Sequence, residues 1–302
     1  MFTLYRIVTA CVLLGISTAS LAQSGAAARN SDAEELKIAA LEALISAPPE
    51  RALPIVRKVL NGEGSDELKE RALFILSQID LPEARSLLLE TARGNEGSLR
   101  EEAIRMIGIS GDSQALGGLS ELYAGGDRET QDAVLEAYLI AGDADAVYRI
   151  AASAQDAEEF DAAVETLGAM GATEQLRALR NRTDMSESLI EAYAIAGDTE
   201  SLREMAMDGS DPERQAEAIE GLGMVGEGVS EILVGIYGST DSPEVREAVV
   251  HGLMMSGDDE AVLQLFRASS DDADKAQLLE ALVMMDSEAV WDVIDATLEN
   301  GQ

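Results

Sequence analysis

A short phrase recurs along this sequence: two apolar or small residues, a glycine and then an aspartate. Clear copies end at Gly111-Asp112, Gly142-Asp143, Gly197-Asp198 and Gly257-Asp258, and weaker copies fall at Gly171, Gly226, Asp286, Asp80 and Pro48. These nine positions, called anchors below, lie 26 to 32 residues apart. A fixed period of this length is typical of helix-turn-helix repeats, so the chain is predicted to fold as an array of such units.

Each repeat contains the signals for two helices. Before an anchor, apolar residues fall at helical spacing, as Ala103, Ile104 and Ile107 do before Gly111. The anchor glycine permits the left-handed conformation that ends a helix, and the aspartate after it can cap the next helix. We therefore predict an all-α fold, an α-solenoid of about nine antiparallel helix pairs with one continuous core and no strands.

The first residues are typical of an export signal. Residues 1–22 contain one charge at Arg6, a short apolar run and small residues before Gln23, which predicts cleavage after Ala22. We expect residues 23–31 to be a flexible lead-in and residues 32–302 to form the solenoid. The predicted location is periplasmic or secreted, without stable membrane insertion after cleavage. A lipid-modified Cys11 is the alternative, since residues 8–11 loosely resemble a bacterial lipobox.

The repeats resemble a known family. Residues 241–266 and 96–122 are similar to HEAT repeats of the short bacterial type that also occurs in phycobilisome lyase subunits. The resemblance implies a ladder in which an arginine early in one helix bonds to an aspartate after a turn. The matching residues are Arg100, Arg246, Asp112, Asp143, Asp198 and Asp258. Gln131, Phe160, Ser186 and Gln215 depart from the arginine, so we expect their repeats to be held less firmly in register.

The charge is strongly acidic. The chain has 22 Lys and Arg against 57 Asp and Glu, a net charge of −35, which argues against nucleic acid and anionic lipid as partners. Acidic residues recur thirteen, ten and six positions before the anchors, on the side of the first helix away from its core positions. In stacked repeats these columns should form an acidic ridge on the outer face, including Glu136, Glu165, Glu191 and Glu220.

Several meanings of this ridge stay open. It can keep a solenoid soluble, reflect adaptation to salt, or dock a basic partner. Residues 151–302 carry a net charge of −26 and residues 23–150 a net charge of −10, so a cationic partner would be steered toward the C-terminal half. Weak calcium binding at Asp271, Asp272 and Asp274 or at residues 258–260 is a further alternative, although no calcium-loop spacing is present.

The sequence offers little material for catalysis. His251 is the only histidine, so a His-based metal site or nucleophile pair cannot be assembled. Gly221 and Gly223 spell part of a nucleotide-binding motif but lie late in a predicted helix, where close helix packing is the simpler interpretation. The pairs Met254-Met255 and Met284-Met285 are expected to fill the core, with an adaptable binding patch as the alternative. No cofactor is predicted.

These observations favour a non-catalytic, exported scaffold that binds a protein or peptide, one with basic character if the ridge is the contact. The second helices are expected to line an inner surface, with Arg149, Arg203 and Arg267 as candidate contacts. The alternative is an accessory or chaperone-like component of an envelope enzyme complex, related in fold to lyase subunits. The oligomeric state is left open.

Overall fold

The computed structural model describes residues 33–95, 97–180, 186–226 and 228–300. The predicted signal peptide (1–22) and lead-in (23–31) lie outside these residues. Contacts divide the chain into two compact units, Met1–Leu88 and Leu89–Gln302, and the division falls within helix α4. Throughout the described residues the regular structure is helical, without strands, and each predicted anchor lies between two helices. The prediction of an all-α solenoid of helix pairs is confirmed.

The first helices of the nine repeats precede the anchors. They are residues 33–42 with the short η1 (Ala43–Ser46), α3 (Asp66–Ser77), α5 (Ser98–Ser110), α8 (Arg128–Ala141), α10 (Ala157–Ala169), α12 (Ser186–Ile195), α14 (Pro212–Val225), α16 (Pro243–Ser256) and α18 (Asp272–Met284).

The second helices follow the anchors. They are α2 (Pro49–Leu60), α4 (Pro82–Gly94), the interrupted pair α6 (Ser113–Gly117) and α7 (Leu119–Gly125), α9 (Ala144–Ser153), α11 (Thr173–Ala178), α13 (Thr199–Ala206), α15 (Ser230–Ser239), α17 (Asp259–Ala268) and α19 (Ala289–Asn300).

The unit Met1–Leu88, described from residue 33, is built on the packing of α2 against α3. Val56 of α2 and Leu73 and Leu76 of α3 are fully buried. Ser65 caps α3 by accepting a hydrogen bond from the Leu68 amide. An exposed ion pair joins Arg71 to Glu42 with 3.5 Å between Nε and Oε1. The helix pair is thus held mainly by apolar burial.

The turns of the larger unit work as the sequence predicts. The anchor glycines at 111, 142, 197 and 257 have φ between 62° and 73°, a conformation that glycine adopts without steric cost. The aspartates after them cap the next helix, as Asp143 does by accepting from the Ala146 amide. At the last anchor, Asp286 adopts φ 53° although it has a side chain. Asp286 therefore bears backbone strain at a place where the six preceding repeats use glycine.

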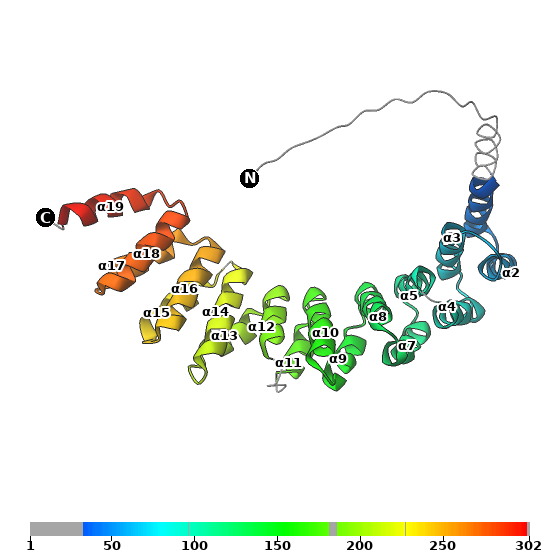
Figure 1. The fold of residues 1–302 in the computed structure, drawn as a ribbon, viewed down its shortest axis with the longest axis horizontal. Coiled ribbons are helices and arrows are strands. Elements are labelled where there is room, and N and C mark those ends of the chain that lie inside the picture. Colours follow the sequence, from blue (N-terminus) through cyan, green and yellow to red (C-terminus); the bar gives the residue numbers. More distant parts are fainter. Residues whose placement is uncertain (1–32, 96, 181–185, 227, 301–302) are drawn as a thin grey trace, which may run out of the picture. The chain divides into compact units, whose positions relative to one another are not determined.

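The larger unit forms two rows of helices (Figure 1). The first-helix row contains α5, α8, α10, α12, α14, α16 and α18, and the second-helix row contains α7, α9, α11, α13, α15 and α17, with α19 beside α18 at the end. From α5 to α16, neighbouring first helices contact one another more extensively than neighbouring second helices do. The row predicted to form the outer face is therefore the more closely packed of the two. In a curved stack the more closely packed row lies on the inside, so within this unit the predicted assignment of first helices to the outer face and second helices to the inner surface is wrong.

Small residues explain this close packing. A Cβ placed on Gly223 of α14 would lie 2.6 Å from the Cα of Gly252 in α16. A Cβ on Gly108 of α5 would lie 2.7 Å from the carbonyl oxygen of Ala137 in α8. Each of these pairs joins a residue three before one anchor to a residue five before the next. The interpretation of Gly223 as a packing glycine is confirmed.

The core follows the predicted helical spacing. From the second repeat to the eighth, the residues eight, seven and four before the anchor are buried, as in Ala103, Ile104 and Ile107, each at 0% exposure. The expectation for the methionines is wrong at two positions, because Met255 is 45% and Met284 65% exposed. These side chains belong to the surface of the C-terminal repeats, and the alternative, an adaptable binding patch, stays a prediction.

Candidate functional site

The acidic ridge exists on the first-helix row. Glu136, Glu165, Glu191 and Glu220 are all exposed on successive first helices. Two of these carboxylates have partners: Arg105 Nε lies 3.7 Å from Glu136, and His251 Nδ1 lies 3.1 Å from Glu220. Within the described residues, Glu165 and Glu191 form no ion pair. The ridge thus keeps a net negative surface after its internal pairs are counted.

The ridge becomes a groove in the C-terminal repeats. A depression of about 700 Å³ lies on the first-helix row and is formed by α14, α16 and α18. We call it the acidic groove. Its polar lining is Glu220, Glu244, Glu247, His251, Gln277 and Glu280, and its apolar lining includes Ala216, Ala248, Val250, Met254, Ala281 and Met284.

The groove combines charge with an apolar floor. Ala248 and Ala281 are buried at its base, whereas the carboxylates of Glu244, Glu247 and Glu280 are exposed. In the described part of the chain, none of these three glutamates has a cationic partner. An apolar strip flanked by unpaired carboxylates suits a ligand with apolar and basic groups side by side.

Like charges crowd the same row beside the groove. Glu217 of α14 is partly buried, and this burial, followed by the negative charges of Glu187 and Glu213, raises the pKa of its carboxyl. Glu213 and Glu217 are four residues apart on one helix, a spacing at which like charges repel. The fold therefore accepts some electrostatic cost to keep its acidic residues together.

The structure corrects the predicted ladder. Arg100 donates to the Thr130 hydroxyl oxygen at 3.2 Å, and Arg246 Nη1 lies 3.0 Å from Asp274. Both partners lie near the start of the next first helix, twelve residues before its anchor, and neither is an aspartate after a turn. Each partner is in reach because the residue eleven positions before one anchor faces the residue twelve positions before the next anchor across neighbouring first helices. Arg246 also donates to the Thr240 carbonyl.

The aspartates after the turns act first as helix caps. Asp112 accepts from the Gln114 and Ala115 amides, and Asp258 accepts from the Ala261 amide. Asp198 combines a cap with an ion pair between repeats. Its side chain is 1% exposed and accepts from Arg177 Nε at 2.7 Å and Nη2 at 2.6 Å. The arginine comes from the second helix α11, so the predicted partner was wrong.

The Asp198 pair is electrostatically strong. Burial acts to raise the pKa of the carboxyl, but hydrogen bonds from Arg177 and Ser201 outweigh burial and hold this pKa below its ordinary value. The hydrogen bond to Asp198 raises the pKa of the Arg177 guanidinium in turn. Arg177 lies six residues after Gly171 and could have been found from that position. The predicted ladder missed it because that ladder considers only arginines in first helices.

Two of the predicted departures from the ladder keep a contact. Gln131 donates to the Tyr123 carbonyl at 3.4 Å, and Gln215 donates to the Ala206 carbonyl at 2.7 Å. Both carbonyls lie at the end of the preceding second helix, where Arg246 finds Thr240. Phe160 is fully buried, and the side chain of Ser186 lies outside the described residues. The looser register of these repeats stays a prediction for hydrogen exchange.

The three candidate arginines lie on the second-helix row. Arg149 of α9, Arg203 of α13 and Arg267 of α17 are exposed and remain candidate contacts. Arg203 lines a cavity of about 480 Å³ with residues of α15, and Arg267 lines a cavity of about 800 Å³ between α17 and the turn before α19. Arg203 and Arg267 thus line two separate cavities and are not brought together.

Other kinds of site receive no support from the described residues. His251 is exposed and bonded to Glu220 on the ridge. Asp271 caps α18 and Asp274 pairs with Arg246, and no cluster of three metal-ligating side chains occurs where side chains are described. Between residues 33 and 300, no described helix is both long and apolar enough to span a bilayer.

The match to a protein family agrees with the fold. Residues 199–289 match the family described as HEAT repeats. Among solved structures, the chain is similar to the complex of CpcE and CpcF of phycocyanin lyase from Nostoc sp. PCC7120, at 16% identity and a TM-score of 0.34, over 80% of this chain and 95% of that one. No curated protein matches the sequence. The chain contains HEAT repeats, and at this level of likeness the lyase activity is not carried over.

Proposed function

We propose that this HEAT-repeat chain is an exported, non-catalytic scaffold that binds a basic segment of a partner protein in the acidic groove. Helical repeat scaffolds present extended surfaces for protein contacts. The observation that carries the proposal is the row of unpaired carboxylates, Glu244, Glu247 and Glu280, above the buried Ala248 and Ala281. Export rests on the sequence of residues 1–22.

The groove suits an amphipathic basic helix or strand. Exposed Met284 and half-buried Met254 supply flexible apolar side chains that adapt to different partner residues. The surrounding glutamates would attract lysine and arginine and steer the encounter. Because these charges lie at an exposed rim, binding should weaken as salt screens them.

A defined peptide pair tests this proposal. A helical peptide of lysine and leucine should bind the full chain, and its glutamate-leucine counterpart should not. Neutralising Glu244, Glu247 and Glu280 to glutamine should weaken the lysine peptide about tenfold or more, since each rim pair contributes up to about 1 kcal/mol. The matched control replaces Glu129, Glu158 and Glu187, which are acidic residues on first helices outside the groove. Equal loss in both triple variants would refute a groove and indicate general charge attraction.

A further inference from the structure

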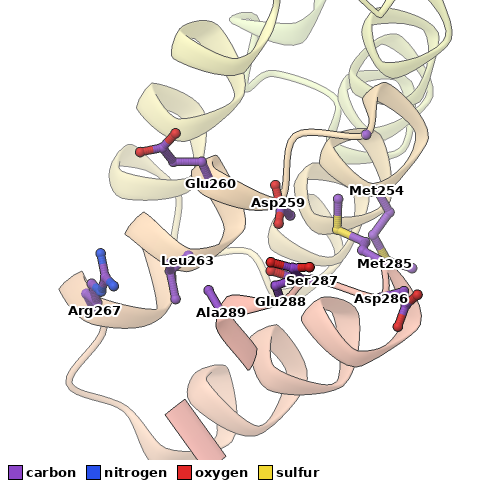
Figure 2. Close-up of a pocket in the computed structure, with 11 residues that line it drawn as sticks. Met254, Asp259, Glu260, Leu263, Arg267, Met285, Asp286, Ser287, Glu288 and Ala289 are labelled. Atoms are coloured by element: carbon purple, nitrogen blue, oxygen red, sulfur yellow. The ribbon is translucent and has the colours of Figure 1, made fainter. Parts of the chain in front are cut away.

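A second site lies on the other side of the C-terminal repeats. The 800 Å³ cavity is formed by the end of α16, by α17 and by the turn that leads into α19 (Figure 2). Leu263 projects from α17, and Ser287 and Glu288 come from the turn. This cavity shares Met254 with the acidic groove but otherwise has a separate lining.

The repeat pattern shows which contact of an earlier interface is absent at this cavity. At an earlier interface, Arg177 stands six residues after Gly171 and Asp198 one residue after Gly197, and the two side chains form the bidentate pair described above. At the interface between the last two repeats, the same two places hold Leu263 and Ser287. Both residues line the cavity. A guanidinium group that the chain supplies internally at one interface is therefore missing at this one.

The chemistry left behind still suits a guanidinium group. Ser287 is 3% exposed, and its hydroxyl has no hydrogen-bond partner in the described residues. A buried hydroxyl without a partner is unfavourable, so an arriving donor would be stabilised there. Figure 2 shows Asp259, Ser287 and Glu288 near the centre of the view, with Arg267 and Asp286 toward its edges. The two central carboxylates offer acceptors for a planar cation.

The charge of the cavity also favours a cation. Its lining has four carboxylates, those of Asp259, Glu260, Asp286 and Glu288, and one guanidinium, that of Arg267. Leu263 and Met254 provide apolar contact for an aliphatic chain. We propose that this cavity binds the side chain of an arginine supplied by a partner protein. The bound guanidinium would take the place that Arg177 fills at the interface three repeats earlier. The proposal does not depend on the acidic groove.

Small arginine analogues test the cavity directly. Trp291 is the only tryptophan of the sequence and lies two residues after Ala289 of the lining, so its fluorescence reports locally. N-acetyl-arginine amide should change this fluorescence saturably, whereas the citrulline analogue, which has the same shape without the charge, should not. Asp259→Asn with Glu288→Gln should weaken binding about tenfold or more. Arg267→Gln should strengthen binding because it removes a like charge.

A closing variant separates the cavity from general charge effects. Leu263→Arg with Ser287→Asp rebuilds the internal pair, so it should abolish arginine binding and raise the denaturation midpoint above that of Leu263→Arg alone. Glu244→Gln in the acidic groove should leave arginine binding unchanged. Absence of saturable arginine binding, equal binding of citrulline or of the lysine analogue, or full binding by the closing variant would each overturn the proposal.

Discussion

Replacing Gly223 by alanine should destabilise the fold although alanine is the better helix former. The added Cβ would lie 2.6 Å from the Cα and 2.7 Å from the carbonyl oxygen of Gly252 on the neighbouring first helix. Both obstacles are backbone atoms, so α14 and α16 must separate. Overpacking of this kind costs about 1–3 kcal/mol, and the gain in helix propensity offsets about 1 kcal/mol of it.

The net expectation for Gly223→Ala is a loss of up to about 2 kcal/mol in the free energy of unfolding. Gly235→Ala is the matched control, because Gly235 lies inside helix α15 with nothing within 4 Å of an added Cβ. This control should gain up to about 1 kcal/mol. Urea denaturation followed by far-UV circular dichroism measures both, and hydrogen exchange locates the change. A Gly223→Ala variant that gains as much stability as the Gly235→Ala control would refute the close approach of α14 and α16.

Three further substitutions probe other features of the fold. Asp286→Gly should stabilise the last repeat by about 1 kcal/mol, since glycine adopts a φ of 53° without strain, and an unchanged thermal midpoint would contradict this. Arg177→Met should lower the free energy of unfolding by about 1.5–3 kcal/mol at neutral pH. Because the pKa of Asp198 is lowered in the fold, the stability from the pair is present above the unfolded pKa of Asp198 and disappears as the pH falls through its folded pKa. A loss that persists in acid would argue against the ion pair. Glu217→Gln should stabilise the fold at neutral pH by roughly 0.2–0.5 kcal/mol through loss of repulsion from Glu213. Since the pKa of Glu217 is raised in the fold, this gain should shrink as the pH falls through that pKa. An effect independent of pH would speak against charge repulsion.

The fold could be predicted because its signals are local. Gly111 or Gly257 ends a helix by its own backbone freedom, and the aspartate after it caps the next helix through amides two or three residues away. Burial of Ala103, Ile104 and Ile107 follows from spacing within one helix. Such features need no knowledge of the neighbouring repeat.

The contacts between repeats were harder to predict. The partner of Arg246 depends on how far one first helix is shifted along the next, and Asp274 rather than an aspartate after a turn lies in reach. The glutamates of the acidic groove were identified in the sequence, but their apolar floor was not, because Met284 was expected in the core. The cavity at Ser287 could not be predicted, because only the contact between Arg177 and Asp198 shows that these two repeat positions meet.

The proposed role of the acidic groove can be tested most directly by photo-crosslinking in the native cell. A photoreactive residue would replace Glu247 in the groove, and in a matched variant would replace exposed Gln264 on the second-helix row. Position 247 should capture a segment rich in lysine or arginine beside apolar residues, with a yield that falls as salt is raised. Capture of the same segment at position 264 and not at 247, or of an acidic segment at 247, would contradict the acidic groove as the binding face.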